Sequence, residues 1–236
     1  MADVRSDIRV LSGSRARLKT ILVLLALISV TGFLVWRQYF QTYHLVVVDE
    51  GKLYRDGNRS LREFNNTLRK TNPRTVIAVV DEKEFKEPEF VAARELVKSR
   101  GLAFHWIPIR AGWYPAAEQV REFLKITSDP ANQPVLYHDD EGIRRAGMMM
   151  AAYQETVLGY DDEKAKASIR AFGHSDRTIN EVRRFIDAYD PVAGLTVDLN
   201  AERAASTQPA TDTSDAPSAT RPTASDAPLA ATTVGK

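Results

Sequence analysis

The sequence predicts an α/β domain in which helices cover a largely parallel central sheet. Short runs of Val, Ile and Leu alternate with segments of helical periodicity along residues 44–190, a pattern typical of this fold class. With 236 residues, 44% hydrophobic content and a formal net charge of +1, the chain is long enough for one domain with appendages, and its charge does not indicate a nucleic-acid partner. Because cysteine is absent, disulfides, thiolate metal sites and cysteine nucleophiles are excluded.

The N-terminal part contains an apolar segment, residues 20–36, that has no charge and is about the minimum length for a membrane-spanning helix. The preceding residues 1–19 are rich in Arg and Lys, which predicts that they stay in the cytoplasm. We therefore expect a single-pass signal anchor that contacts the membrane and leaves the main domain outside the cytoplasm, in the periplasm if the source is bacterial. A cleaved signal peptide is the alternative, although no Ala-x-Ala pattern follows the segment.

Five apolar runs predict the strands. The first two flank Asp49-Glu50-Gly51, which indicates a hairpin, and the later runs are continuous enough for strands buried on both faces. The five expected strands are residues 44–48, 52–55, 75–80, 103–109 and 134–138.

Segments of helical spacing separate and follow these strands. Gly159 and Pro191 mark the ends of two of them. The expected helices are residues 89–100, 115–126, 144–158, 162–171 and 176–189.

The C-terminal residues 201–236 contain no aromatic residue and repeat the letters SDAP. Such a composition buries too little apolar surface to offset the entropy of ordering the chain. We therefore expect a disordered, low-complexity tail.

The loop after the expected strand 134–138 is the candidate site, because sites in sheets of this kind lie beyond the carboxyl ends of the strands. It reads HDDEGIRRAG, with a glycine in the loop and two arginines at the start of a helix. This layout is typical of a phosphate-binding loop. Three consecutive carboxylates, Asp139, Asp140 and Glu141, nevertheless stand where an anion would bind.

The order of LYRDGNRS, TVIAVVDEKE, HWIPI with a Trp-containing turn, and PVLYH with its loop resembles the cysteine-dependent protein tyrosine and dual-specificity phosphatase family. The resemblance covers residues 45–173. The family signature is His-Cys-x-x-Gly-x-x-Arg-Ser/Thr-Gly, and this chain matches it at His138, Gly142, Arg145 and Gly147. Asp139 replaces the cysteine.

The resemblance implies a mechanism whose chemical parts this chain lacks. In the family a cysteine thiolate attacks phosphorus, loop amides and the arginine hold the phosphate oxygens, and a Ser/Thr hydroxyl assists the leaving thiolate. Here Asp139 and Ala146 replace the cysteine and the hydroxyl. The loop at residues 110–116, where the family carries an aspartate as general acid, has no carboxylate, and Glu118 falls on the following helix.

These departures predict a catalytically inactive pseudophosphatase that acts as a binding or scaffolding domain. We expect Asp139 to occupy the anion cradle and to pair with Arg145. Trp113 and Tyr114 are a candidate recognition surface for a protein partner beside the degenerate pocket. The expected remnant of the phosphate loop is His138, Asp139, Asp140, Glu141, Gly142, Ile143, Arg144, Arg145, Ala146 and Gly147.

Alternatives remain for the acidic residues of this loop. They could ligate Mg²⁺ or Ca²⁺, although companion ligands are not evident in the sequence. Asp139 could also act as a nucleophile that forms an acyl phosphate, or the loop could bind phosphate without cleaving it. The preferred interpretation includes no metal and no cofactor.

Overall fold

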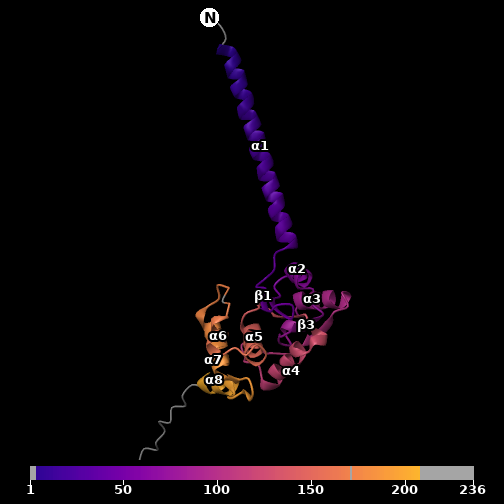
Figure 1. Cartoon of the computed structure of the whole chain (residues 1–236), viewed down its shortest axis with the longest axis vertical. Coiled ribbons are helices and arrows are strands. Elements are labelled where there is room, and N and C mark those ends of the chain that lie inside the picture. The colour runs from indigo at the N-terminus through magenta and orange to yellow at the C-terminus, as the bar shows by residue number, and fades with distance from the viewer. Residues whose placement is uncertain (1–3, 171, 208–236) are drawn as a thin grey trace, which may run out of the picture. The chain divides into compact units, whose positions relative to one another are not determined.

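The computed structural model describes residues 4–170 and 172–207 and contains a five-stranded sheet in the order β1-β2-β5-β3-β4 (Figure 1). Strands β1 and β2 form the expected antiparallel hairpin, and the other neighbouring strands pair in parallel. The prediction of a mostly parallel sheet flanked by helices is therefore confirmed. The strands are β1 (Val46–Asp49), β2 (Leu53–Gly57), β3 (Thr75–Ala78), β4 (Ala103–Trp106) and β5 (Val135–Asp139).

Helices cover both faces of the sheet because the strand side chains are apolar on both faces. Leu53, Val135 and Tyr137 point into the core formed with α4 (Ala117–Ser128), α5 (Arg144–Thr156) and α7 (Asp176–Ala188). On the other face, Val76 and Leu136 pack with apolar side chains of two further helices. These are α2 (Leu61–Thr71) and α3 (Pro88–Ser99).

Shorter elements complete the domain. The helix α6 (Asp162–Ala167) is shorter than predicted. Two 3-10 turns, η1 (Glu84–Lys86) and η2 (Pro130–Asn132), follow β3 and α4, respectively. A second small sheet consists of β6 (Tyr189–Asp190) and β7 (Gly194–Leu195).

Several element boundaries differ from the prediction, among them the end of β3, which was expected at residue 80, and two of the differences have local reasons. Strand β4 ends at Trp106 because its partner β3 ends at Ala78, and Pro108 has no backbone N–H to donate. Helix α4 starts at Ala117 instead of Pro115, because the side chain of Gln119 folds back and accepts a hydrogen bond from the backbone N–H of Ala116 at 2.7 Å.

The N-terminal helix α1 (Val4–Tyr39) is continuous over 36 residues and extends beyond both ends of the apolar segment 20–36. Its part from Arg17 to Tyr39 has a mean hydropathy of 2.4 over its most apolar window, and none of that window is buried in the structure. At 1.5 Å per residue, these 23 residues measure about 35 Å, slightly more than the hydrocarbon thickness of a bilayer. By length and composition, this helix is able to cross a membrane.

The C-terminal prediction needs one correction. Helix α8 (Leu199–Thr207) includes the first residues of the segment 201–236 that we expected to be disordered. Three alanines and a glutamate in AERAAS favour helix, and the overall composition concealed this local propensity. Residues 208–236 lie outside the described part of the chain.

Candidate functional site

The candidate site is the loop that joins β5 to α5, and it packs against the end of β2. The backbone N–H of Asn58 donates to the carbonyl oxygens of Asp139 at 3.1 Å and Asp140 at 3.0 Å. Gly142 adopts φ +71°, and a Cβ atom there would lie 2.6 Å from the backbone nitrogen of Gly57. Glycine is therefore required at this position both for its conformation and for the close approach of the two chains.

The carboxylate of Asp139 lies in the amide cradle of this loop. Its Oδ1 accepts a hydrogen bond from the backbone N–H of Gly142, and its Oδ2 accepts one from Ala146 at 3.1 Å. Only 3% of the side chain is exposed. Backbone N–H groups at a helix N-terminus favour an anion. In this protein the bound anion is a side chain of the loop itself.

Arg145 is held by two carboxylates. Its Nε lies 3.8 Å from Oδ2 of Asp139, so the expected pair forms. The main partner, however, is Glu84 in η1, which accepts hydrogen bonds from both terminal nitrogens, one of them at 2.8 Å. Although burial lowers the pKa of Arg145, the hydrogen bond to Glu84 and the charge of Asp139 together hold that pKa above its ordinary value.

Glu84 is positioned by the acidic loop that follows β3. Its Oε2 accepts from the backbone N–H of Asp81 at 2.9 Å, while Oδ1 of Asp81 accepts from the N–H of Glu84 at 2.8 Å. The other oxygen of Asp81 accepts from the N–H of Ala111 at 3.2 Å. Sequence reasoning missed this arrangement, although DEKE begins three residues after the end of β3, which ends at the site.

The loop at residues 110–116 is attached at two places. Arg144, which forms an ion pair with Glu181 on α7, donates to the carbonyl oxygens of Trp113 at 2.7 Å and Gly112 at 3.2 Å. On the other side, the amide of Asn200 accepts from the N–H of Tyr114 at 2.8 Å and donates to its carbonyl at 3.0 Å. These contacts hold the loop in one position beside the cradle.

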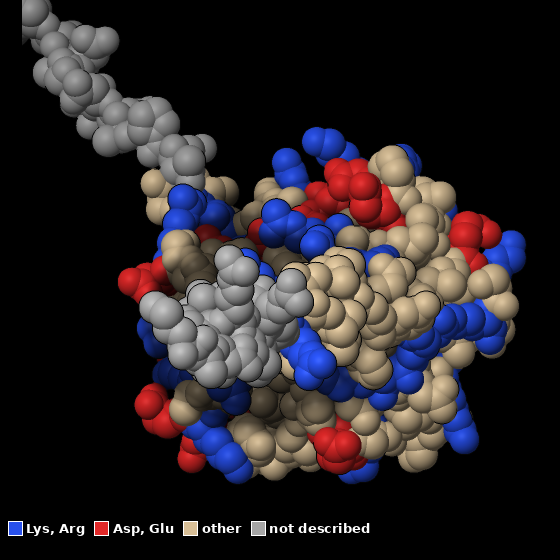
Figure 2. Space-filling model, turned by 90° about the horizontal axis from the view of Figure 1, so that it is seen from above, with Lys and Arg blue, Asp and Glu red and all other residues tan. Residues whose placement is uncertain are grey.

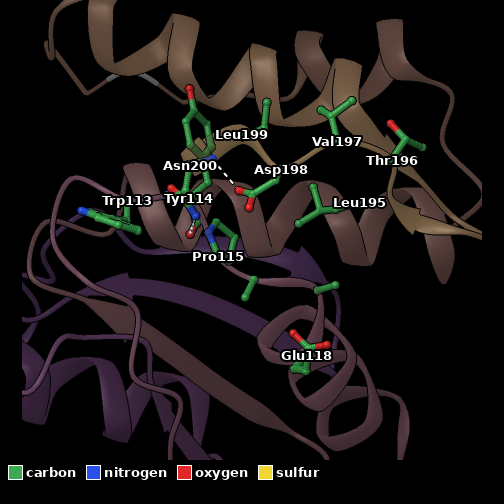
Figure 3. A pocket seen from close by; sticks show the side chains of 12 residues that line it. Trp113, Tyr114, Pro115, Glu118, Leu195, Thr196, Val197, Asp198, Leu199 and Asn200 are labelled. Atoms are coloured by element: carbon green, nitrogen blue, oxygen red, sulfur yellow. Dashed lines mark hydrogen bonds between the residues drawn. The ribbon is translucent and has the colours of Figure 1, made fainter. Parts of the chain in front are cut away.

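The structure separates the two candidate recognition residues. Trp113 is 42% exposed and lies under the guanidinium of Arg110, whereas Tyr114 is only 5% exposed and lies under Arg144. Trp113 borders a hollow of about 420 Å³ between this loop and residues 195–200 (Figure 3). Glu118 also lines this hollow, where its side chain is 77% exposed and paired with Arg121.

The other loop residues have different surroundings. His138 points to the opposite face of the sheet, between Phe64 and Phe90, and burial lowers its pKa to about 4. Partial burial, followed by the charges of Asp139 and Glu84, raises the pKa of Asp140. Ile143 and Gly147 are buried, and the carbonyl of Ala146 accepts a hydrogen bond from the hydroxyl of Tyr137 at 3.0 Å.

Glu141 lies on the outer side of the loop beside two histidines. Its backbone oxygen is 2.7 Å from Nδ1 of His44, and its carboxylate is 3.4 Å from Nδ1 of His174. Within residues 4–170 and 172–207, no three His, Asp or Glu side chains form a group suited to a metal ion.

A buried cation behind the cradle was not predicted. Arg55 on β2 is fully buried, and its guanidinium lies 6.0 Å from the ring centre of Phe172. Arg55 on β2 is paired with Tyr137 on the neighbouring strand β5. Asp139 follows Tyr137 by two residues on that strand, so Arg55 lies close to the start of the cradle loop. Burial lowers its pKa, and the charge of Asp139 opposes this change. The cation therefore adds to the positive potential that favours a carboxylate in the cradle.

The fold and the loop together define a domain of the tyrosine and dual-specificity phosphatase class. The chain belongs to the family described as "DSP-PTPase phosphatase fused to NAD+ Kinase", whose family model matches residues 35–186. Among curated proteins, it is 32% identical over 77 residues to "Probable NAD kinase 2, chloroplastic" of Oryza sativa subsp. japonica. That match covers 32% of this chain and only 8% of the rice protein.

Solved structures with the same fold include two phosphatase-class proteins. The core catalytic domain of PP-IP phosphatase SIW14 from S. cerevisiae, in complex with citrate, has a TM-score of 0.53 and 19% identity, over 71% of this chain and 93% of that one. TpbA of P. aeruginosa has a TM-score of 0.51 and 18% identity, over 66% of this chain and 92% of its own. At these identities the likeness concerns the fold alone.

Proposed function

We propose that this chain is a membrane-anchored pseudophosphatase, a phosphatase-class domain that binds a partner and does not hydrolyse phosphate esters. The observation that carries the proposal is the carboxylate of Asp139 in the amide cradle, with hydrogen bonds from Gly142 and Ala146. The position that a phosphate would take is thus already filled by a negative group. A phosphate placed about 4 Å from that carboxylate would be repelled by about 4 kcal/mol at an effective dielectric constant of 20.

The surrounding residues support the same proposal. A thiolate is excluded because the chain has no cysteine, and Ala146 has no hydroxyl to assist a leaving group. Arg145, which the family resemblance assigns to phosphate binding, is bonded to Glu84 instead. The loop 110–116, which supplies no carboxylate, is attached to Arg144 and Asn200. A general acid is therefore missing from the loop where the resemblance places it.

The proposed binding role uses the exposed side of the same loop. Trp113 is a large exposed aromatic residue at the edge of a hollow, and such residues are enriched at protein interfaces. The residues that line the hollow, drawn in Figure 3, include none of the cradle loop 138–147. A protein partner could therefore contact this surface without entering the filled phosphate position.

The proposed location follows from α1 and the basic residues before its apolar part. Arg5, Arg9, Arg15, Arg17 and Lys19 precede residues 20–36, which favours a cytoplasmic N-terminus. The phosphatase-class domain is then outside the cytoplasm, attached to the membrane by α1.

Restoring the cysteine and the hydroxyl of the family signature tests whether their loss explains the proposed lack of phosphate-ester hydrolysis. We expect the unaltered protein to give no turnover of an aryl phosphate above background, with or without Mg²⁺. Asp139→Cys combined with Ala146→Ser replaces the resident carboxylate by a thiol that ionises to a nucleophilic thiolate beside the same amides, so slow turnover is expected with a good leaving group. Adding Arg145→Met to this variant should abolish the gain. The proposal is wrong if the unaltered protein hydrolyses the ester and Asp139→Asn abolishes that activity.

A further inference from the structure

The outer side of α2 is bonded to the end of α1. The side-chain amide of Asn66 donates to the backbone carbonyls of Gln38 at 3.1 Å and Gln41 at 2.9 Å. Arg69 donates to the carbonyl of Tyr39 at 2.6 Å and lies 5.4 Å from the centre of its ring. Carbonyls at the end of a helix have no partner within the helix, so these bonds satisfy them. Helix α2 is therefore held where the apolar part of α1 ends.

Two hollows lie at this junction. The first measures about 500 Å³ and is lined by Val35 of α1, by Phe40 just after that helix, and by Arg69 and Lys70 of α2. The second measures about 410 Å³ and is lined by apolar residues of α1 together with Arg37 and Arg62. Each hollow therefore combines an apolar wall with two cationic side chains.

The charges of these hollows are mostly uncompensated. Among the described residues, neither Lys70 nor Arg37 takes part in an ion pair, and Arg62 has only Glu63 at 3.7 Å. Figure 2, seen along α1 from its N-terminal side, shows many Lys and Arg side chains on the face of the domain that is turned toward the viewer, with separate groups of Asp and Glu among them and toward the margin. A negatively charged group is the complementary ligand for such a surface.

We propose that the two hollows bind anionic phospholipids of the leaflet next to the domain. The lipid phosphate would contact Arg69 and Lys70 in one hollow and Arg62 and Arg37 in the other, while the acyl chains follow the exposed apolar surface of α1. The apolar walls favour a lipid over free phosphate, because they are continuous with the segment that is able to cross the bilayer. The inference rests on the proposed membrane anchoring and is independent of catalytic activity.

Lipid retention by the full-length chain tests the proposal. The protein is purified in an uncharged detergent, mixed with phosphatidylglycerol or phosphatidylcholine at equal concentration, and examined by native mass spectrometry. We expect phosphatidylglycerol to be retained at least about tenfold better. Glycerol phosphate at the same concentration should not displace it, because it lacks acyl chains.

Paired variants locate the site. Each basic side chain near a membrane surface contributes about fivefold to the binding of anionic lipid. Arg62→Gln with Lys70→Gln removes one cation from each hollow, so it should weaken retention of phosphatidylglycerol about fivefold at each of them. These two positions leave the Asn66 and Arg69 contacts with α1 intact. Lys98→Gln with Lys125→Gln, on the exposed sides of α3 and α4, changes the charge equally and should change retention less than twofold.

The outcomes separate this inference from the anchoring on which it rests. Equal retention of the two lipids, equal behaviour of the two variant pairs, or displacement by glycerol phosphate would each overturn lipid binding. Release of the chain from membranes by alkaline carbonate would instead contradict the anchor. If the protein stays in the membrane but shows no preference between lipids, only the lipid site is wrong.

Discussion

The pair between Arg145 and Glu84 gives a quantitative test of how the cradle is held. Arg145→Met keeps most of the side-chain volume but leaves the carboxylates of Glu84 and Asp139 without their cation. The side chains of Arg145, Glu84 and Asp139 are only 8%, 16% and 3% exposed. Removing one partner of a buried pair costs about 3–5 kcal/mol. Glu84 keeps the N–H of Asp81 and Asp139 keeps two amides, so we expect a loss near the lower end, about 3 kcal/mol.

A double-mutant cycle isolates the part of this loss that belongs to the pair. Glu84→Gln, Arg145→Met and the double variant are unfolded with urea and followed by tryptophan fluorescence. We expect a coupling free energy of about 1.5–3 kcal/mol. Arg121→Met is the matched control, because Arg121 pairs with Glu118 on the exposed side of α4, and its effect should stay within about 0.5 kcal/mol. A coupling below about 0.5 kcal/mol would refute the reasoning.

Three further predictions follow from other parts of the molecule. Glu155 is buried, and burial followed by the charge of Asp162 raises its pKa to about 7, so the folded state holds a proton that the unfolded state releases near its ordinary pKa of 4.5. Stability should therefore fall as the pH rises from about 4.5 to 7, and Glu155→Gln should remove this part of the slope and stabilise the protein at pH 8 by about 1–3 kcal/mol in urea titrations. Gly142→Ala should destabilise the domain by about 2–4 kcal/mol in the same assay, whereas Gly101→Ala, which has a positive φ and open space around it, should cost about 1 kcal/mol; equal losses would argue against the close approach of the two loops. In cells, the full-length chain should resist extraction by alkaline carbonate, and a reporter active only outside the cytoplasm should be active when fused after Tyr43; recovery of a shortened soluble chain would identify a cleaved signal instead.

The sheet could be predicted because its strands are buried on both faces and therefore appear as continuous apolar runs. Helix α2 was missed because its sequence, LREFNNTLRKT, presents only Phe64 and Leu68 as large buried apolar residues. Its buried Asn66 is explained by hydrogen bonds to α1, a contact between parts of the chain that local periodicity does not reveal. The helical start of the C-terminal segment is not apparent from composition, because the helix-favouring residues AERAAS precede a much longer stretch rich in Pro, Ser and Thr.

The features of the site that could be predicted are those whose residues lie close together in the sequence. The loop glycine, the helix start and the closeness of Asp139 to Arg145 all follow from one short stretch of sequence. The role of Glu84 did not, because it reaches Arg145 from 61 positions away through the geometry of a separate loop. The sequence predicts Tyr114 at a recognition surface, whereas contacts with Arg144 and Asn200 hold it in the interior. Contacts of this kind depend on the packing of loops at the sheet edge.

The most direct test of the filled cradle is calorimetric titration of the full-length protein with inorganic phosphate. We expect no binding by the unaltered chain at millimolar phosphate, because the carboxylate of Asp139 occupies the position. Asp139→Ser removes the charge and should bind phosphate with a dissociation constant below about 1 mM, and Arg145→Met should abolish that binding. Phosphate binding by the unaltered protein as tight as that of Asp139→Ser would contradict the account.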